Sequence, residues 1–223
     1  MWTVSTSTSQ PRDVDTVNIS RTIPSVSTYH HGNLREELVR TAVALAREKG
    51  EEGVVLREVA RRAGVSHNAA YRHFADRDEL LAQVALAGLQ ELGAAMTERL
   101  RAPGGGSAAD RARKRLRELG RAYVHFALDE PGLFVVAFSC DPAGDPGDDG
   151  PYELLGEALD GLVAAGAMDP AARPGAETVC WSAVHGFSLL HLDGPLRHLP
   201  VPEREAELDR MLLLLERGLA DPA

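Results

Sequence analysis

Polar side chains between residues 66 and 73 form the part of the sequence whose residue types could do chemistry. If this segment is helical, one face of the helix carries almost no aliphatic surface. The side chains on that face are His67, Asn68, Tyr71, Arg72 and His73. In the major groove of DNA, Asn pairs with adenine and Arg with guanine, while Ser, Tyr and His hydrogen-bond to phosphate oxygens. The segment therefore indicates contact with a duplex.

The charge distribution supports such a contact locally but not over the whole chain. The formal net charge is -9, which by itself argues against a polyanionic partner. The window from Arg57 to Arg77 differs, because it holds five arginines against only Glu58 and Asp76, a local charge of +3. A solvated helix face would give a similar count, so charge alone does not separate the two interpretations.

Two short helices joined by a tight turn would position these side chains. The periodicity predicts one helix over residues 56–63 and another over residues 67–74. Gly64 permits the positive φ that the turn needs, and Ser66 can cap the second helix. The buried side of the first helix would consist of Leu56, Val59 and Ala60. This arrangement is a helix-turn-helix, and a helical hairpin with a merely polar outer face is the alternative.

Three stretches of the sequence resemble the TetR family of transcriptional regulators. They are residues 29–35 (YHHGNLR), residues 56–66 (LREVARRAGVS) and residues 71–74 (YRHF). The resemblance is dense from residue 29 to about residue 92. It implies an all-α chain in which a helix-turn-helix domain precedes a helical ligand-binding and dimerisation domain.

The resemblance also implies roles for single residues. Phosphates would be held by Ser66, Tyr71 and His73, with help from Arg57 and Arg77. Base edges would be read by His67, Asn68 and Arg72. The sequence departs from the family pattern at Val55, where members usually carry a threonine that caps the helix and pairs with the acid at Glu58. The lost cap predicts a cost of about 1 kcal/mol and weaker clamping of the duplex, not a lost function.

The remaining periodicity predicts helices throughout, with no alternating run long enough for a strand. Residues 1–28 hold six Ser and six Thr without aliphatic periodicity and are interpreted as a flexible arm. Residues 29–76 are assigned to the DNA-binding domain, whose first helix begins with Asn33 as N-cap and ends near Gly50. Residues 77–223 form the second domain, and a long helix from Asp76 to about Leu100 joins the two.

The second domain carries aromatic residues that could line a ligand cavity. Trp181, His185 and Gly186 match the Trp-x-x-x-His-Gly signature of one TetR subgroup. The predicted pocket residues are Tyr123, Phe126, Phe134, Phe138, Trp181 and His185. Plain core packing is the alternative for each of them, and a satisfied core histidine is the alternative for His185.

The final helix, over residues 203–220, has an apolar face. This face carries Leu208, Met211, Leu212, Leu215 and Leu219. Paired with its two-fold mate, it would form the four-helix dimer interface that the resemblance implies. The basic run over residues 111–121 is interpreted as a solvated helix face, because its apolar residues define a separate buried side.

Other classes of protein fit less well. The sequence contains no HExxH, GxSxG, P-loop or GxGxxG motif, so an enzyme is not expected, and no cofactor or metal site is indicated. Cys140 and Cys180 are read as packing residues in a reducing cytoplasm, although they could sense oxidants. No apolar stretch long enough for a membrane span is evident. The hypothesis is a homodimeric, ligand-released repressor of a palindromic operator; a protein-interaction module is the alternative.

Overall fold

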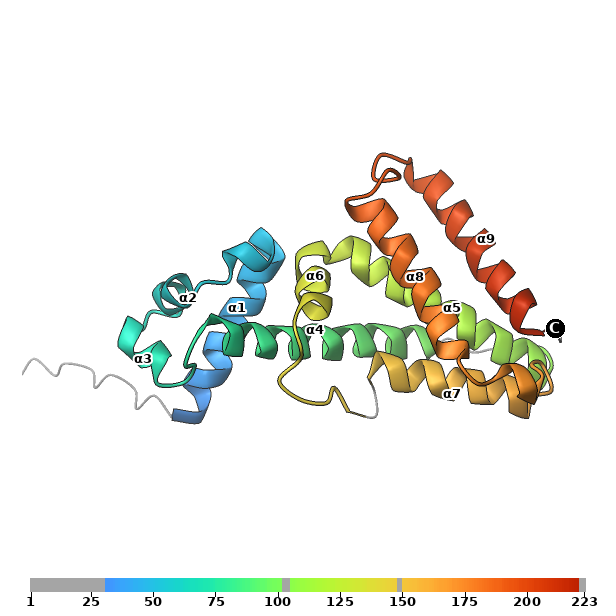
Figure 1. Cartoon of the computed structure of the whole chain (residues 1–223), viewed down its shortest axis with the longest axis horizontal. Helices are drawn as coiled ribbons and strands as arrows, with labels where there is room; N and C mark the ends of the chain where they lie inside the picture. The colour runs from blue at the N-terminus through green and yellow to red at the C-terminus, as the bar shows by residue number, and fades with distance from the viewer. Residues whose placement is uncertain (1–30, 102–104, 148–149, 221–223) are drawn as a thin grey trace, which may run out of the picture.

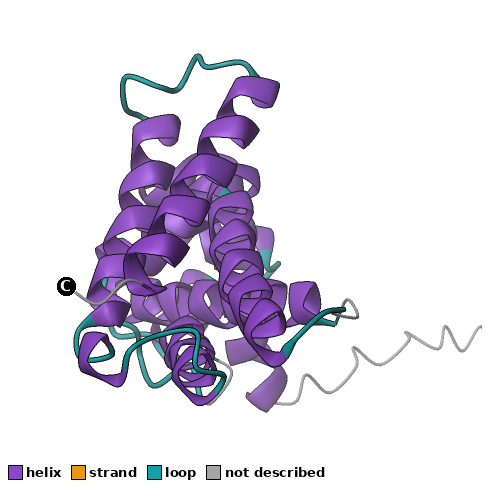
Figure 2. Cartoon of the chain, turned by 90° about the vertical axis from the view of Figure 1, so that its right-hand side faces the viewer, coloured by secondary structure: helices purple, strands orange, loops and turns teal. Residues whose placement is uncertain are grey.

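The computed structural model describes residues 31–101, 105–147 and 150–220, and the regular secondary structure of these residues is entirely helical (Figures 1 and 2). The predicted arm at residues 1–28 lies outside them. The N-terminal helices are α1 (His31–Gly53), α2 (Leu56–Arg62) and α3 (His67–Tyr71), followed by the long α4 (Arg77–Leu100). The second half contains α5 (Ala108–Asp129), α6 (Pro131–Ser139), α7 (Pro151–Ala164), a 3-10 turn (Pro170–Ala172), α8 (Ala176–Leu192) and α9 (Val201–Ala220). The all-α prediction is confirmed.

The helix-turn-helix forms at the predicted place, but its helices are shorter than predicted: α2 ends at Arg62, and α3 ends at Tyr71 instead of residue 74, because the chain turns at residues 72 and 73. The predicted inner residues of α2 are buried, and Gly64 has a φ of +69° in the turn. Such a conformation is strained for any residue with a Cβ, which explains the glycine. Ser66 accepts a hydrogen bond from the backbone N–H of Ala69 and so caps α3. Phe74 is fully buried behind α3, and its ring lies 4.8 Å from the guanidinium of Arg35.

The first helix differs from its prediction at the start. It begins at His31, so Asn33 lies inside the first turn and is not the N-cap. Its predicted end is confirmed, because Gly50 adopts φ 65° and interrupts the helical backbone before a last short turn to Gly53. Periodicity locates a helix well but fixes its first turn poorly, because that turn contributes no core residue.

The helix α4 connects the two halves, as Figure 1 shows. Asp76 accepts a hydrogen bond from the N–H of Glu79 and caps it, as predicted. By length and composition α4 could cross a membrane, which corrects the expectation that no stretch is long enough. Length and composition are weak support for a span, because the core helix of a globular protein passes the same test, and α4 packs against α1, α5, α6 and α7.

The basic run on α5 is only partly a solvated face, which corrects its interpretation: Arg111 is exposed, but other members of the run contact α9. Arg117 forms an ion pair with Glu216 and Arg121 with Asp209, and Nε2 of His125 lies 3.0 Å from the Glu205 carboxylate, so polar contacts join α5 to α9. These contacts turn part of the leucine stripe of α9 inward. The side chain of Leu212 covers Gly120, where an added Cβ would lie 2.6 Å from its Cδ2.

This packing overturns part of the predicted dimer interface. Leu208 and Leu212 are buried within the subunit and do not line the groove between α8 and α9, so they do not fit the predicted interface, whereas Leu219, although buried, lines this groove. Met211 and Leu215 are half-buried and face a groove between α8 and α9. The most exposed apolar side chain of α9 is Leu214, at 60% exposure. Leucines occupy both sides of this helix, and the face that the periodicity singled out is divided between the packing against α5 and the groove.

The short helix α6 packs tightly against both α1 and α4. A Cβ added to Gly132 would lie 2.1 Å from the carbonyl oxygen of Ala46 in α1. On the other side, a Cβ added to Gly88 of α4 would lie 2.9 Å from the Cβ of Ala137. Backbone contact of this closeness leaves α6 little room to move independently of α1.

Candidate nucleic-acid interface and candidate ligand site

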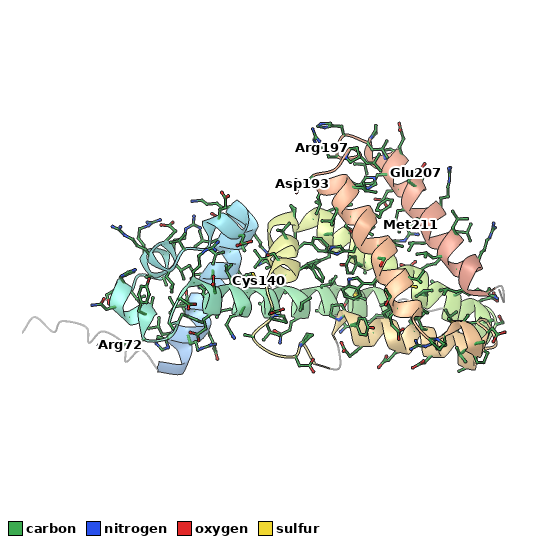
Figure 3. The ribbon with its side chains drawn as sticks, in the orientation of Figure 1. Arg72, Cys140, Asp193, Arg197, Glu207 and Met211 are labelled. Atoms are coloured by element: carbon green, nitrogen blue, oxygen red, sulfur yellow. The ribbon has the colours of Figure 1, made fainter. Side chains whose placement is uncertain are left out.

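The outer face of α3 presents polar side chains to solvent. His67, Asn68, Tyr71 and Arg72 are exposed, and His73 is half-buried. Arg72 lies at the far end of the N-terminal half, remote from α8 and α9 (Figure 3). The rings of His67 and Tyr71 meet edge to face, with their centroids 4.6 Å apart. The structure therefore displays most of the predicted contact residues on one surface.

The arginines of this region fall into two groups. Arg61 and Arg62 both bind Glu58, and Arg62 also binds Glu48. Hydrogen bonds from Arg61 above all, and from Arg62, lower the pKa of the Glu58 carboxyl to about 2. Among the described residues, Arg57 and Arg72 have no ion-pair partner. Of the local positive charge, these two cations are the ones free to meet phosphates or bases.

Arg77 has a structural role in this arrangement. Its guanidinium donates to the carbonyl oxygen of Val54 at 2.8 Å and to that of Glu51 at 2.7 Å. It also lies 3.4 Å from the Glu51 carboxylate. These bonds tie the start of α4 to the end of α1, so the guanidinium is largely occupied within the subunit.

The missing cap at Val55 is visible in the structure. Val55 stands at the N-cap of α2 with extended backbone angles and no side-chain hydrogen bond. The Glu58 carboxylate, which would complete a capping box, instead binds Arg61 and Arg62. The family's usual capping pair is thus replaced by ion pairs on the outer side of α2.

Five of the six predicted pocket residues come together between α5, α6 and α8. The Tyr123 ring lies 5.7 Å from Phe134 and 5.3 Å from Trp181. Phe138 completes the group, 5.8 Å from Trp181 and 5.2 Å from His185. We call these five residues the aromatic cluster. Phe126 does not belong to it, because this side chain faces a shallow groove between α4 and α5.

A hydrogen bond joins the two polar members of the aromatic cluster. The Tyr123 hydroxyl lies 2.8 Å from Nδ1 of His185. Burial raises the pKa of the Tyr123 phenol and lowers that of the His185 imidazole, so both groups are neutral near neutral pH. The structure thus provides an internal partner for His185, as the core-histidine alternative expects.

Trp181 separates two hollows of different size. On its inner side, with Tyr123 and Leu212, lies a cavity of about 30 Å³, enough for a water molecule but not for a larger ligand. On its outer side lies a hollow of about 370 Å³ that Phe138 and Tyr152 also line. Sequence reasoning missed Tyr152, since it occupies the first turn of a helix with no neighbouring aromatic residue, although its ring lies 5.9 Å from Trp181.

A wide apolar groove of about 850 Å³ runs between α8 and α9. It is lined by Val179, Ala183 and Phe187 of α8 and by Met211, Leu214 and Leu215 of α9. Glu207 and Arg210 border it, and Figure 3 shows Glu207 and Met211 along α9. Figure 2 shows the hairpin that α8 and α9 form as it projects from the other helices. Apolar surface of this extent is typical of an interaction site.

Comparisons with known proteins agree with this architecture. Residues 38–84 match the profile of bacterial regulatory proteins of the tetR family, and residues 116–215 match the tetracyclin repressor-like C-terminal domain. No curated protein matches the chain.

Solved structures provide a second comparison. A protein of unknown function from Rhodococcus sp. RHA1 is 30% identical, with a TM-score of 0.70, over 88% of this chain and 100% of that one. A TetR variant from Acinetobacter baumannii AYE in complex with minocycline is 20% identical, with a TM-score of 0.58, over 81% and 93% of the two chains. The TetR-family regulator PfmR from Thermus thermophilus is 22% identical, with a TM-score of 0.53, over 82% and 99%. The chain belongs to the TetR family of transcription regulators and is not an enzyme.

Proposed function

We propose that this regulator is a cytoplasmic repressor that binds a palindromic operator as a homodimer and is released by a small molecule. The observation that carries the proposal is the outer face of α3, where Asn68, Tyr71 and Arg72 are exposed beside a capped helix start. Arg57 at the start of α2 adds a second cation without an ion-pair partner among the described residues. Few aliphatic side chains interrupt this surface, so it suits a hydrated groove better than a protein core.

The contact residues fall into two classes in this proposal. Asn68, Arg72 and His67 would reach base edges from the major groove. Ser66, Tyr71, His73 and Arg57 would hold phosphates, with Ser66 donating its hydroxyl proton outward while its oxygen caps α3. Arg77 would hold the start of α4 against the end of α1 rather than contact the duplex, because its donors are already bound to Val54 and Glu51.

Dimerisation would use the groove between α8 and α9. Two copies related by a two-fold axis would place each α8–α9 hairpin against the other as a four-helix bundle. Leu214 and Val179 would then be buried, and Glu207 of each copy could approach Arg210 of the other at the groove border. The two α3 helices would enter successive major grooves about 34 Å apart, which requires a near-palindromic site.

Release would pass from the aromatic cluster to the DNA-binding half through α6. This helix carries Phe134 and Phe138 on one side, and on the other its Gly132 backbone touches α1. The pair between Arg47 of α1 and Glu130, 2.8 Å apart, reinforces the same contact. A ligand that displaces the two phenylalanines would therefore shift α1 and change the spacing of the α3 helices, with a coupling of about 1 to 3 kcal/mol.

The test is operator retention by the purified full-length protein. Genome-wide footprinting supplies the binding fragments, and Arg72→Ala and Tyr71→Phe are compared with the wild type on them. We expect Arg72→Ala to weaken binding about tenfold or more, since a bidentate arginine contact contributes about 1 to 3 kcal/mol. Arg101→Ala, which removes an exposed cation from the far end of α4, should have no effect.

A protein-interaction module would give a different result. In that case neither α3 variant would change DNA retention, and wild-type binding would not weaken steeply as salt concentration rises. Thermal unfolding of each variant separates a lost contact from a lost fold.

A further inference from the structure

The hollow on the outer side of Trp181 has the features of a ligand site. Figure 1 shows the chain leaving α6 and passing α4 toward α7, and Figure 3 labels Cys140 at the end of α6. The hollow lies beside this segment, because Cys140, Pro142 and Pro146 line it. The N–H of Ala143 donates to the carbonyl oxygen of Ala82 in α4 at 3.0 Å, which fixes this crossing segment against the helix. The hollow measures about 370 Å³, within the range of small-molecule pockets.

Three aromatic rings form much of its wall. The Trp181 ring lies close to both other rings. Its centroid is 5.8 Å from that of Phe138 and 5.9 Å from that of Tyr152. The interplanar angles of 74° and 52° show that the rings are not stacked on one another. Rings inclined in this way can surround a ligand and present their electron-rich faces to it, and Trp has the strongest such face.

The only charged side chain among the described residues that line the hollow is a carboxylate. Glu153 lies in the first turn of α7, is exposed, and has no hydrogen-bond or ion-pair partner among the described residues. Described arginines nearby are engaged elsewhere, for example Arg115 with Glu157. The hollow therefore carries a free negative charge beside three aromatic faces.

We propose that this hollow binds an organic cation, an amine or quaternary ammonium group attached to an apolar body. The inference rests on the proposed function, because it names the chemical class of the effector. A cation would gain attraction from the rings and from Glu153, whereas an anion would meet Glu153 without any compensating positive charge. Displacement of Trp181 and Phe138 by the apolar body would act on α6 directly.

Three probes of nearly one shape test the charge preference. They are phenyltrimethylammonium, its uncharged isostere tert-butylbenzene, and the anionic benzenesulfonate. Binding is followed by the fluorescence of Trp181 in full-length protein carrying Trp2→Phe, which leaves one tryptophan. We expect the cation to bind about tenfold more tightly than the neutral probe, as a desolvated cation–π contact allows. Equal or tighter binding of the neutral or anionic probe would overturn the proposal.

Two further variants locate the site. Glu153→Gln should weaken binding of the cation about three- to fivefold and leave the neutral probe unchanged, because the carboxylate is exposed and partly screened. Tyr152→Leu should weaken it by a similar factor. Glu203→Gln removes an exposed carboxylate that has no ion-pair partner among the described residues and does not line the hollow, so it should have no effect. A silent Glu153→Gln variant would contradict the assignment.

This experiment separates the ligand class from the regulatory role, because it needs no DNA. Cation binding that leaves operator retention unchanged would confirm the ligand class and overturn only the effector role of the hollow. Absence of cation binding in a protein that still binds its operator would overturn the inference and leave the repressor intact.

Discussion

The outer face of α3 and the groove between α8 and α9 are both exposed, but the side chains of the first are polar and those of the second are apolar. The α3 face presents amide, hydroxyl, imidazole and guanidinium groups, and of the two alanines of α3, Ala70 is buried and Ala69 is half-buried. The groove presents leucine, valine and phenylalanine side chains, with charges only at its border. Polar display suits a partner that stays hydrated, whereas an apolar groove suits one that excludes water. In the proposed function, this difference assigns the α3 face to DNA and the groove to a second subunit.

The largest effect is expected from a charge in the groove. Leu214→Glu should prevent dimer formation and lower operator affinity by more than tenfold, because a carboxylate would be buried in an apolar interface without a partner. Sedimentation and operator titration measure the two losses. Val201→Glu is the matched control, since Val201 is 57% exposed on the same helix but does not line the groove. A dimeric Leu214→Glu protein would show that the groove is not the interface.

Next in size is the contact between α6 and α1, which in the proposed function links the aromatic cluster to the DNA-binding half. Gly132→Val should lower the free energy of unfolding by about 1 to 3 kcal/mol, because its side chain would collide with the Ala46 carbonyl. Any folded fraction should respond poorly to ligand. Denaturant unfolding measures the loss, with Gly161→Ala as control, because nothing lies within 4 Å of a Cβ at that position. The control should be neutral or more stable, and equal behaviour of both variants would contradict the close packing of α6.

Smaller effects are expected from the two caps of the α3 region. Ser66→Ala should cost about 1 kcal/mol of stability, because it removes the hydrogen bond to Ala69 at 3.2 Å. Val55→Thr should add about 0.5 to 1 kcal/mol by supplying the cap that α2 lacks. Thermal unfolding of both variants measures the changes. A destabilising Val55→Thr would mean that the ion pairs of Glu58 already compensate for the missing cap.

The smallest effect is a pH dependence of the aromatic cluster. Burial lowers the pKa of His185 below its ordinary value, so the unfolded chain binds the proton more readily than the folded one. The contribution of the neutral imidazole to the free energy of unfolding is fully present above the ordinary pKa of about 6.5. It is lost as the pH falls through the lower pKa that His185 has in the folded protein. Between about pH 7.5 and about pH 5, wild-type Tm should fall more than that of His185→Gln. Parallel curves for the two proteins would contradict a neutral, hydrogen-bonded imidazole.

The helix-turn-helix was predictable because its signals are local. Gly64 must occupy positive φ, and Ser66 and Asp76 must cap the helices that follow them, whatever the rest of the chain does. The exposed residues of α3 followed from the same boundaries. Asn33 failed as a cap because several polar residues precede the first core residue, and each could begin the helix.

The second half was harder to predict because its outcome depends on which helices become neighbours. Leu212 and Leu214 lie two positions apart on α9, and only the docking onto Gly120 of α5 decides that Leu212 is buried and Leu214 exposed. For the same reason Tyr123 belongs to the aromatic cluster and Phe126 does not, since neighbouring faces of α5 pack against different helices. The arginines of α5 predicted a polar surface on this helix, but they could not predict that acidic residues of α9 contact it.

The ion pairs between α5 and α9 make the groove between α8 and α9 sensitive to salt, as the outer face of α3 is when it binds DNA. Arg117, Arg121 and His125 hold the helix that forms half of the groove, and several of these groups remain partly open to solvent. Dissolved ions screen such pairs just as they compete for phosphate oxygens. Concentrated electrolyte would therefore loosen the seating of α9 while it also weakens the grip on the double helix. In the proposed function, a rise in ionic strength would therefore act on both the pairing of subunits and the binding of the operator.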